Sequence, residues 1–300
     1  MTTPPPSPEP TLRAADGATM TLWSRDWPAP AKINLFLHVV GRRADGYHLL
    51  QTAFRFLDFG DTLRFSPRTD GVIHLATPLS GVPPETDLTV RAARRLQSAA
   101  GVRLGAEIEL VKRLPVGGGL GGGSSDAATV LMALNRLWGV NLPTTELQRL
   151  GLELGADLPI FLHGRSAFGE GVGERFTDLT QVLAPAWYLV LVPAVQVPTA
   201  TIFAAPDLPR ATPPVSPGDW RPGQGGNDLE AVAGRLYPEV ARHLEWLRRF
   251  GPARMSGSGA CVFSEFADQA VASAALALLP PDMKGFVARG LDRHPLLELT

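Results

Sequence analysis

The sequence has little cysteine, little lysine and no long apolar run. Cys261 is the only cysteine among 300 residues, so an internal disulfide and a zinc site built on paired cysteines are both excluded. No stretch approaches the roughly 18 apolar residues that a membrane-spanning helix needs. The N-terminal MTTPPPSPEP lacks the basic and apolar regions of a signal peptide. We therefore expect a soluble, cytoplasmic protein.

An excess of basic charge is also missing. Lysine and arginine number 28 against 29 acidic residues, for a net charge of −1, which disfavours nucleic acid and anionic membranes as partners. Only three of the basic residues are lysines, namely Lys32, Lys112 and Lys284. Each is worth inspection, because arginine replaces a compact ammonium poorly. With 45% hydrophobic and 19% charged residues, the composition is that of a globular protein with one large or two ordinary domains.

The periodicity predicts mixed strands and helices. Strands are expected at 32–41, 72–79, 107–114, 187–192 and 285–291, with a turn and strand at 253–266 and a hairpin around Gly60 within 50–65. Helices are expected at 88–100, capped by Asp87 and closed by Gly101, and at 126–139, 238–250 and 268–279. A further helix at 144–155 would begin with a threonine cap after Pro143. Because strict βαβ alternation is missing, the fold class is α+β.

Two segments read as irregular. Residues 2–10 hold five prolines and no large apolar side chain, so the tail over 1–21 is expected to be disordered. Residues 205–226 are rich in proline and glycine with little periodicity, which is typical of a long loop.

The strongest functional signal is a glycine-rich loop between a strand and a helix. Residues 115–125 read PVGGGLGGGSS, and Ser124, Ser125 and Asp126 are expected at the helix cap and first turn. A flexible backbone that leads into a helix N-terminus presents N–H groups to an anion, so the loop predicts a phosphate site. The residues of this site are Pro115, Val116, Gly117, Gly118, Gly119, Leu120, Gly121, Gly122, Gly123, Ser124 and Ser125.

The loop alone leaves the kind of phosphate open. A Walker loop is excluded, because no lysine follows the glycines. Gly117, Gly119 and Gly122 match the G-x-G-x-x-G of dinucleotide sites, but no acidic residue ends a following strand at the required distance. A plain turn with a serine cap is the simplest alternative.

Other candidates carry two interpretations each. Asp157 is either a base near the phosphate or part of a helix-terminating turn, and Lys32 either neutralises phosphoryl oxygens or lies at a strand edge. Residues 45–48, DGYH, could stack on a flat ring or form a simple turn. The SGSG turn at 256–259 could complete a nucleotide pocket. Asp126 could touch Mg²⁺ or complement the helix dipole, and Cys261 is expected to pack as a small apolar residue.

In order along the chain, these motifs resemble one family. PAPAKINLFLHVVGRRADGYHLLQTAF, LPVGGGLGGGSSDAATVLMALN, LGADLPIFLHG with FGEGVGE, and RMSGSGACVF are similar to the motifs of the 4-diphosphocytidyl-2-C-methyl-D-erythritol kinases. That family belongs to the superfamily of galactokinase, homoserine, mevalonate and phosphomevalonate kinases and acts in the non-mevalonate isoprenoid pathway. The resemblance covers the chain from about Trp27 to the C-terminus.

The resemblance implies a two-domain α+β kinase with its active site in the cleft between an ATP-binding domain at 22–180 and a C-terminal domain at 181–300. ATP with Mg²⁺ would lie on residues 115–125. Asp157 would take the proton from the 2-hydroxyl of a cytidine-diphosphate methylerythritol, and Lys32 would be its charge-stabilising partner. The implied substrate cradle consists of Asn34, Tyr47, His48, Phe54, Thr199 and Phe203.

Two other functions stay open at this stage. An NAD(P)-dependent oxidoreductase rests on the G-x-G-x-x-G match alone. A non-catalytic nucleotide-binding module is disfavoured by the presence of both Asp157 and Lys32.

Overall fold

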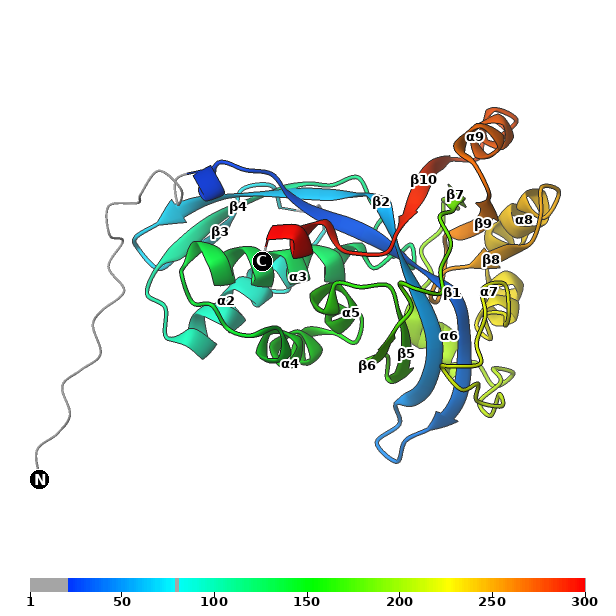
Figure 1. The fold of residues 1–300 in the computed structure, drawn as a ribbon, viewed down its shortest axis with the longest axis horizontal. Coiled ribbons are helices and arrows are strands. Elements are labelled where there is room, and N and C mark those ends of the chain that lie inside the picture. The colour runs from blue at the N-terminus through cyan, green and yellow to red at the C-terminus, as the bar shows by residue number, and fades with distance from the viewer. Residues whose placement is uncertain (1–20, 79–80, 300) are drawn as a thin grey trace, which may run out of the picture.

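One long pair of antiparallel strands runs through the whole molecule. In the computed structural model, which describes residues 21–78 and 81–299, β1 (Trp27–Arg42) pairs with β2 (His48–Arg68) along nearly its full length. We call this pair of strands, β1 with β2, the ribbon. In Figure 1 the ribbon passes from a first body that contains α2 to α5 into a second body that contains α6 to α9. The proline-rich tail expected to be disordered lies outside the described residues, apart from its last position.

The first body combines a sheet with four helices on one face (Figure 1). Its elements after the ribbon are β3 (Ile73–Leu75), α2 (Leu88–Ala100), β4 (Gly105–Val111), α3 (Gly122–Leu137), α4 (Thr144–Leu154), α5 (Leu158–His163), β5 (Ala167–Gly171) and β6 (Arg175–Asp178). β4 pairs with β2, and β3 runs parallel to β4. The short hairpin of β5 and β6 attaches to β2 further along the ribbon.

The second body continues the same sheet. Its elements are β7 (Trp187–Leu191), α6 (Thr199–Ala204), α7 (Glu230–Leu236), α8 (Pro238–Leu247), β8 (Ala253–Met255), β9 (Val262–Phe266), α9 (Gln269–Ala277) and β10 (Gly285–Leu291), followed by a 3₁₀ helix (Pro295–Leu299). Among the described residues the strand order is β3-β4-β2-β10-β7-β9-β8, with β1 and β5 also on β2. This mixture confirms the α+β class.

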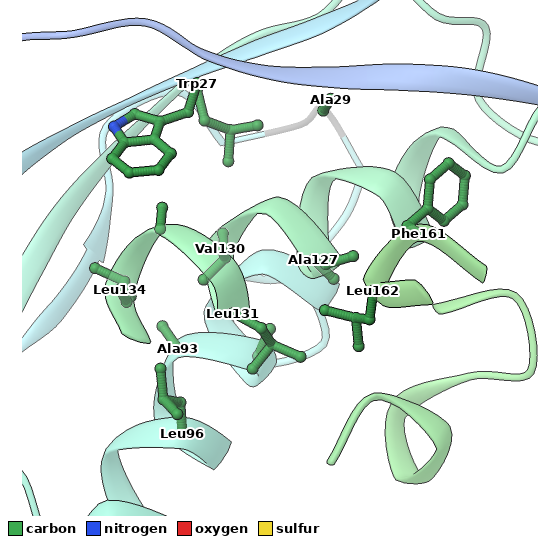
Figure 2. Packing of buried hydrophobic residues seen from close by; sticks show 14 of the residues in the cluster. Trp27, Ala29, Ala93, Leu96, Ala127, Val130, Leu131, Leu134, Phe161 and Leu162 are labelled. Atoms are coloured by element: carbon green, nitrogen blue, oxygen red, sulfur yellow. The ribbon is translucent and has the colours of Figure 1, made fainter. Parts of the chain in front are cut away.

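Helix α3 is the centre of the first core. Figure 2 shows α3, with Val130 and Leu131, lying between Trp27 and Ala29 of β1 on one side and Ala93 and Leu96 of α2 on the other. Helix α2 begins and ends as the sequence predicts, because the Asp87 carboxylate accepts the Thr89 N–H and Gly101 takes the left-handed conformation. A second core lies under α7, α8 and α9 and includes Leu37 and Val39 of β1.

The hairpin expected around Gly60 is wrong, because β2 passes through this glycine as one continuous strand. Gly60 pairs with Pro30, and a Cβ built on Gly60 would lie 2.2 Å from the Ala29 carbonyl oxygen. The glycine therefore permits a close backbone approach and does not make a turn.

Smaller expectations also needed correction. Thr144 is the first residue of α4 and not its cap, which is Pro143. The strand expected at 72–79 is only the three residues of β3. The loop at 205–226 is confirmed and is anchored by buried Trp220, whose ring stacks on Phe36.

No helix in the described part of the chain has the length and apolar character needed to cross a bilayer.

Candidate active site

A cavity of about 490 Å³ opens where the two bodies meet the ribbon. Its floor is the middle of β1 and β2, which contribute Lys32, Asn34, Thr52 and Phe54. The first body adds the glycine loop and Asp157, and the second body adds residues from α6 and the turn at 257–259. Side chains and backbone from both bodies therefore surround one space.

The glycine loop and the start of α3 form one wall of this cavity. Helix α3 begins at Gly122 with Gly121 as its N-cap, so the serine cap expected from the sequence is wrong and Ser124 lies inside the first turn. Gly121 has φ 72°, and a Cβ there would lie 2.8 Å from the Phe161 ring. Because the N–H groups of a first turn lack helical partners, the start of α3 presents donors to the cavity.

The predicted loop residues do not all face this space. Leu120 is buried, and its carbonyl oxygen accepts the Lys32 N–H. Ser125 is also buried, and its hydroxyl donates to the Pro30 carbonyl at 2.7 Å. The other nine residues between Pro115 and Ser124 line the cavity.

The SGSG turn packs directly against the glycine loop. The Ser256 hydroxyl donates to the Gly119 carbonyl at 2.9 Å, and the Cys261 N–H donates to the Gly118 carbonyl at 3.0 Å. The Asn227 side chain fixes the turn by donating to the Met255 and Gly257 carbonyls. Burial raises the pKa of the Cys261 thiol to about 12, in keeping with its expected role as a small packing residue.

Lys32 and Asp157, far apart in the sequence, lie together in the cavity. Lys32 Nζ is 3.3 Å from Asp157 Oδ2 and 2.8 Å from Asn34 Oδ1. Lys32 is 2% exposed whereas the Asp157 side chain is 44% exposed, so the ammonium is fixed and the carboxylate faces open space. Asp157 occupies the junction at which α4 has ended and α5 begins. This pair can accept a proton and offer positive charge at one point.

The expected substrate cradle is placed in part. Asn34, Phe54, Thr199 and Phe203 line the cavity. His48 lies behind Phe203, with the two rings stacked at 4.8 Å between centroids. Burial and then the charges of nearby Arg210 and Arg42 lower the pKa of His48, which keeps the ring neutral.

Tyr47 is 63% exposed and lies outside the cavity lining. Its position in the turn before β2 makes its ring available to solvent, beside His48.

Lys112 is a site residue that the motifs do not identify. Its Nζ donates to Asp61 Oδ2 at 2.6 Å and to Asp126 Oδ2 at 2.7 Å, while its side chain lines the cavity beside Gly122. Burial lowers the pKa of Lys112, but the two carboxylates outweigh this and raise it. Asp126 is therefore occupied by a lysine, so its interpretation as a Mg²⁺ ligand is not supported.

Thr52 and Leu50 are two further cavity residues that the sequence analysis missed. They share a face of β2 with Phe54, because side chains two positions apart on a strand point the same way. The period-2 pattern that leads from Phe54 back to Thr52 and Leu50 was the available signal.

The described residues disfavour two other kinds of site. They contain no group of three or more His, Cys, Asp or Glu side chains arranged to hold a metal ion. Helices α4 and α5 are the next described elements after α3, so no strand ends about 20 residues beyond the glycine loop to supply the acidic residue of a dinucleotide site.

Each of the two bodies contains a segment that matches a known protein family. Residues 87–165 match the family described as GHMP kinases N terminal domain. Residues 219–280 match the family described as GHMP kinases C terminal.

Full-length relatives are similar over nearly all of the chain. A 4-diphosphocytidyl-2-C-methyl-D-erythritol kinase of Dechloromonas aromatica is 62% identical, over 91% of this chain and 100% of the relative. One from Thiobacillus denitrificans is 59% identical, over 92% and 99%. A crystal structure of 4-(cytidine 5′-diphospho)-2C-methyl-D-erythritol kinase is 37% identical with a TM-score of 0.74, over 89% of this chain and 99% of the other.

Proposed function

Because the chain belongs to the 4-diphosphocytidyl-2-C-methyl-D-erythritol kinase family of GHMP kinases, we propose that it phosphorylates the 2-hydroxyl of 4-diphosphocytidyl-2-C-methyl-D-erythritol with ATP. The observation that carries this proposal is the Lys32–Asp157 pair, 3.3 Å apart in the same cavity as the glycine loop. A kinase needs a proton acceptor, a positive charge and a phosphate cradle within reach of one another, and the Asp157 carboxylate, the Lys32 ammonium and the glycine loop are suited to these three roles.

The triphosphate of ATP is assigned to the glycine loop. The loop leaves room for a phosphate, because a Cβ on Gly117, which lines the cavity, would meet no atom within 4 Å. The start of α3 supplies backbone N–H groups and the positive end of the helix dipole. Both favour anions and neither requires a side chain.

Asp157 is assigned as the base. The 2-hydroxyl of the acceptor loses its proton to the Asp157 carboxylate while its oxygen forms a bond to the γ-phosphorus of ATP. The bond from that phosphorus to the bridging oxygen breaks, and ADP leaves with the electron pair. The Lys32 ammonium stabilises the negative charge on the transferring group, and its burial keeps it in place.

The cytidine end of the acceptor is assigned to the second body and the ribbon turn. His48 and Phe203 provide stacked rings, Tyr47 is the exposed neighbour of His48 in the chain, and Thr199 provides a hydroxyl on the cavity wall. Aromatic rings suit a cytosine because its faces stack, and a neutral His48 can exchange hydrogen bonds with the ring edge.

Mg²⁺ is the expected companion of ATP. Ser124 lines the cavity, and its hydroxyl is an oxygen donor of the hard type that this ion prefers, so it would help to hold the ion beside the ATP phosphates. When bound, the ion would neutralise charge on the phosphates.

We also propose a domain boundary near residue 180 and a cytoplasmic location.

The first test is ADP release by purified protein with ATP, Mg²⁺ and 4-diphosphocytidyl-2-C-methyl-D-erythritol, beside a control that lacks this acceptor. Acceptor-dependent ADP is the expected result. ATP binding without ADP release would keep the phosphate loop and reject this acceptor.

Asp157→Asn tests the base separately. The substitution keeps the size of the side chain but removes its basicity, so turnover is expected to fall by about 1,000-fold. ATP affinity should stay within about threefold, because the loop binds phosphate without Asp157. Unchanged turnover would remove Asp157 from the reaction.

A further inference from the structure

A chain of hydrogen bonds connects the strand backbone to the Lys32 ammonium through Thr52. Thr52 lies on β2 in the cavity wall and is 1% exposed. Its hydroxyl donates to the Phe36 carbonyl at 2.5 Å, and Asn34 Nδ2 lies 2.9 Å from the same hydroxyl oxygen. Asn34 Oδ1 then lies 2.8 Å from Lys32 Nζ.

The donor and acceptor roles along this chain are fixed by chemistry. A carbonyl oxygen only accepts, so the single hydroxyl proton of Thr52 is committed to Phe36. The Thr52 oxygen can then only accept, and the Asn34 side chain must turn its NH₂ group toward it. An ammonium only donates, so the same amide must turn its carbonyl oxygen toward Lys32. Both ends require the same orientation of Asn34.

A β-bulge in β1 accompanies this arrangement. Asn34 pairs with Phe54 and Phe36 with Ala53, so β1 has one more residue than β2 between these pairs. The carbonyl of the extra residue, Leu35, accepts from Arg254, and the carbonyl of Phe36, which follows it, accepts from Thr52. Bulges commonly redirect side chains beside active sites.

We propose that Thr52 is a positioning residue for phosphoryl transfer, because it fixes the Asn34 amide that holds the Lys32 ammonium toward Asp157. This inference rests on the proposed function. One N–H of Lys32 goes to Asn34, a second faces Asp157, and the third is left for the phosphoryl group. If Asn34 turned over, its NH₂ group would face the ammonium, donor against donor, and Lys32 would leave this position.

Thr52→Val tests the role, since valine fills the same volume but cannot accept from Asn34. We expect kcat to fall about 30-fold, with the KM for ATP within about twofold, because a small displacement of a charged group weakens the transition state more than the bound substrate. Thr52→Ser keeps the hydroxyl and should retain kcat within about threefold of the wild type.

Thr129→Val is the matched control. Thr129 is also fully buried and also donates its hydroxyl to a backbone carbonyl, that of Pro28, but it does not contact the chain to Lys32. We expect Thr129→Val to lower the thermal midpoint about as much as Thr52→Val does, but to leave kcat unchanged. Should Thr52→Val not fold, Thr52→Cys replaces it, because a thiol is a weak acceptor of similar size.

A double-mutant cycle with Asn34→Ala separates positioning from general damage. Once Asn34 is gone, Thr52→Val should lower kcat by less than about twofold further. Equal losses in both backgrounds, wild-type kcat in Thr52→Val, or a Thr52→Ser variant as slow as Thr52→Val would each overturn the proposal.

Asp157→Asn, measured in parallel, keeps the two hypotheses distinguishable. If Asp157→Asn is fully active, the proposed base fails and the positioning role fails with it. If Asp157→Asn is inactive while Thr52→Val is fully active, only the role of Thr52 is rejected.

Discussion

The buried cluster of Lys112, Asp61 and Asp126 predicts a specific dependence of stability on pH. One ammonium serves two carboxylates, so full ionisation would leave a net negative charge out of water. Asp61 Oδ1 accepts the N–H groups of Arg113 and Leu114, whereas Asp126 Oδ1 has no hydrogen-bond partner among the described residues. We therefore expect Asp126 to carry a proton at neutral pH.

The pKa of Asp126 gives the sign and the upper limit of the effect. Burial, with the charge of Asp61 adding to it, raises this pKa to about 8 against the attraction of Lys112. The folded protein then binds more protons than the unfolded chain between about pH 4 and pH 8, so this group lowers stability as the pH rises through that window. The part of this window between pH 5 and pH 8, about three pH units, corresponds to a loss of at most about 4 kcal/mol in the free energy of unfolding. Since Lys112 is 17% exposed to water, we expect about half of that limit.

Asp126→Asn isolates this contribution, because asparagine resembles the protonated acid and has no proton to lose. Urea unfolding at pH 5 to 9 gives the free energy of unfolding of each protein, and the difference between wild type and variant removes all other titrating groups. The wild type should lose about 2 kcal/mol relative to the variant between pH 5 and pH 9.

Asp282→Asn is the control for this series. Asp282 is exposed, and its hydrogen bond with Arg242 lowers its pKa, so it stays ionised throughout the window and its difference curve should be flat. A flat difference curve for Asp126→Asn, or a wild type that gains stability relative to this variant as the pH rises, would refute the proton on Asp126.

Three further results are expected. Lys32→Arg should lower kcat by about 100-fold in the ADP assay, since Lys32 Cε lies so near Gly121 that a Cβ there would be 3.1 Å away, which leaves little room for a guanidinium. Gly119→Ala should lower the free energy of unfolding by about 3 kcal/mol in urea, because its φ is 75° and its Cβ would lie 2.1 Å from the Ser256 carbonyl. His48→Ala should raise the KM for the acceptor about tenfold with little change in kcat, measured by initial rates at varied acceptor.

Elements with their own start and stop signals could be predicted from the sequence. The alternation in 32–41 gave β1, and Asp87 with Gly101 gave the bounds of α2, because those signals act over a few residues. The hairpin predicted at Gly60 was wrong because the contact that requires a glycine there is not local. Its neighbour is the Ala29 backbone from another strand, and no local pattern records such a contact.

The candidate site divides in the same way. The glycine loop could be predicted from the sequence, because backbone freedom and the start of a helix depend on neighbouring residues alone. The approach of Lys32 to Asp157 was an expectation from family resemblance, since spacing does not bring together residues on β1 and at the start of α5. The contacts of Lys112 with Asp61 and Asp126 depend on three elements packing together. In the sequence, only the scarcity of lysine drew attention to Lys112.

The continuous ribbon of β1 and β2 sets which parts of the site are rigid. Lys32, Asn34 and Thr52 are carried by paired strand backbone, whereas Asp157 sits on a short connection between two helices and half faces the solvent. In the proposed reaction, we therefore expect the ammonium to be the fixed group and the carboxylate to be the group that adjusts to the acceptor. Changes in α6 and in the turn at 256–259, which line the cavity from the second body, would then alter the size of acceptor that fits without moving Lys32.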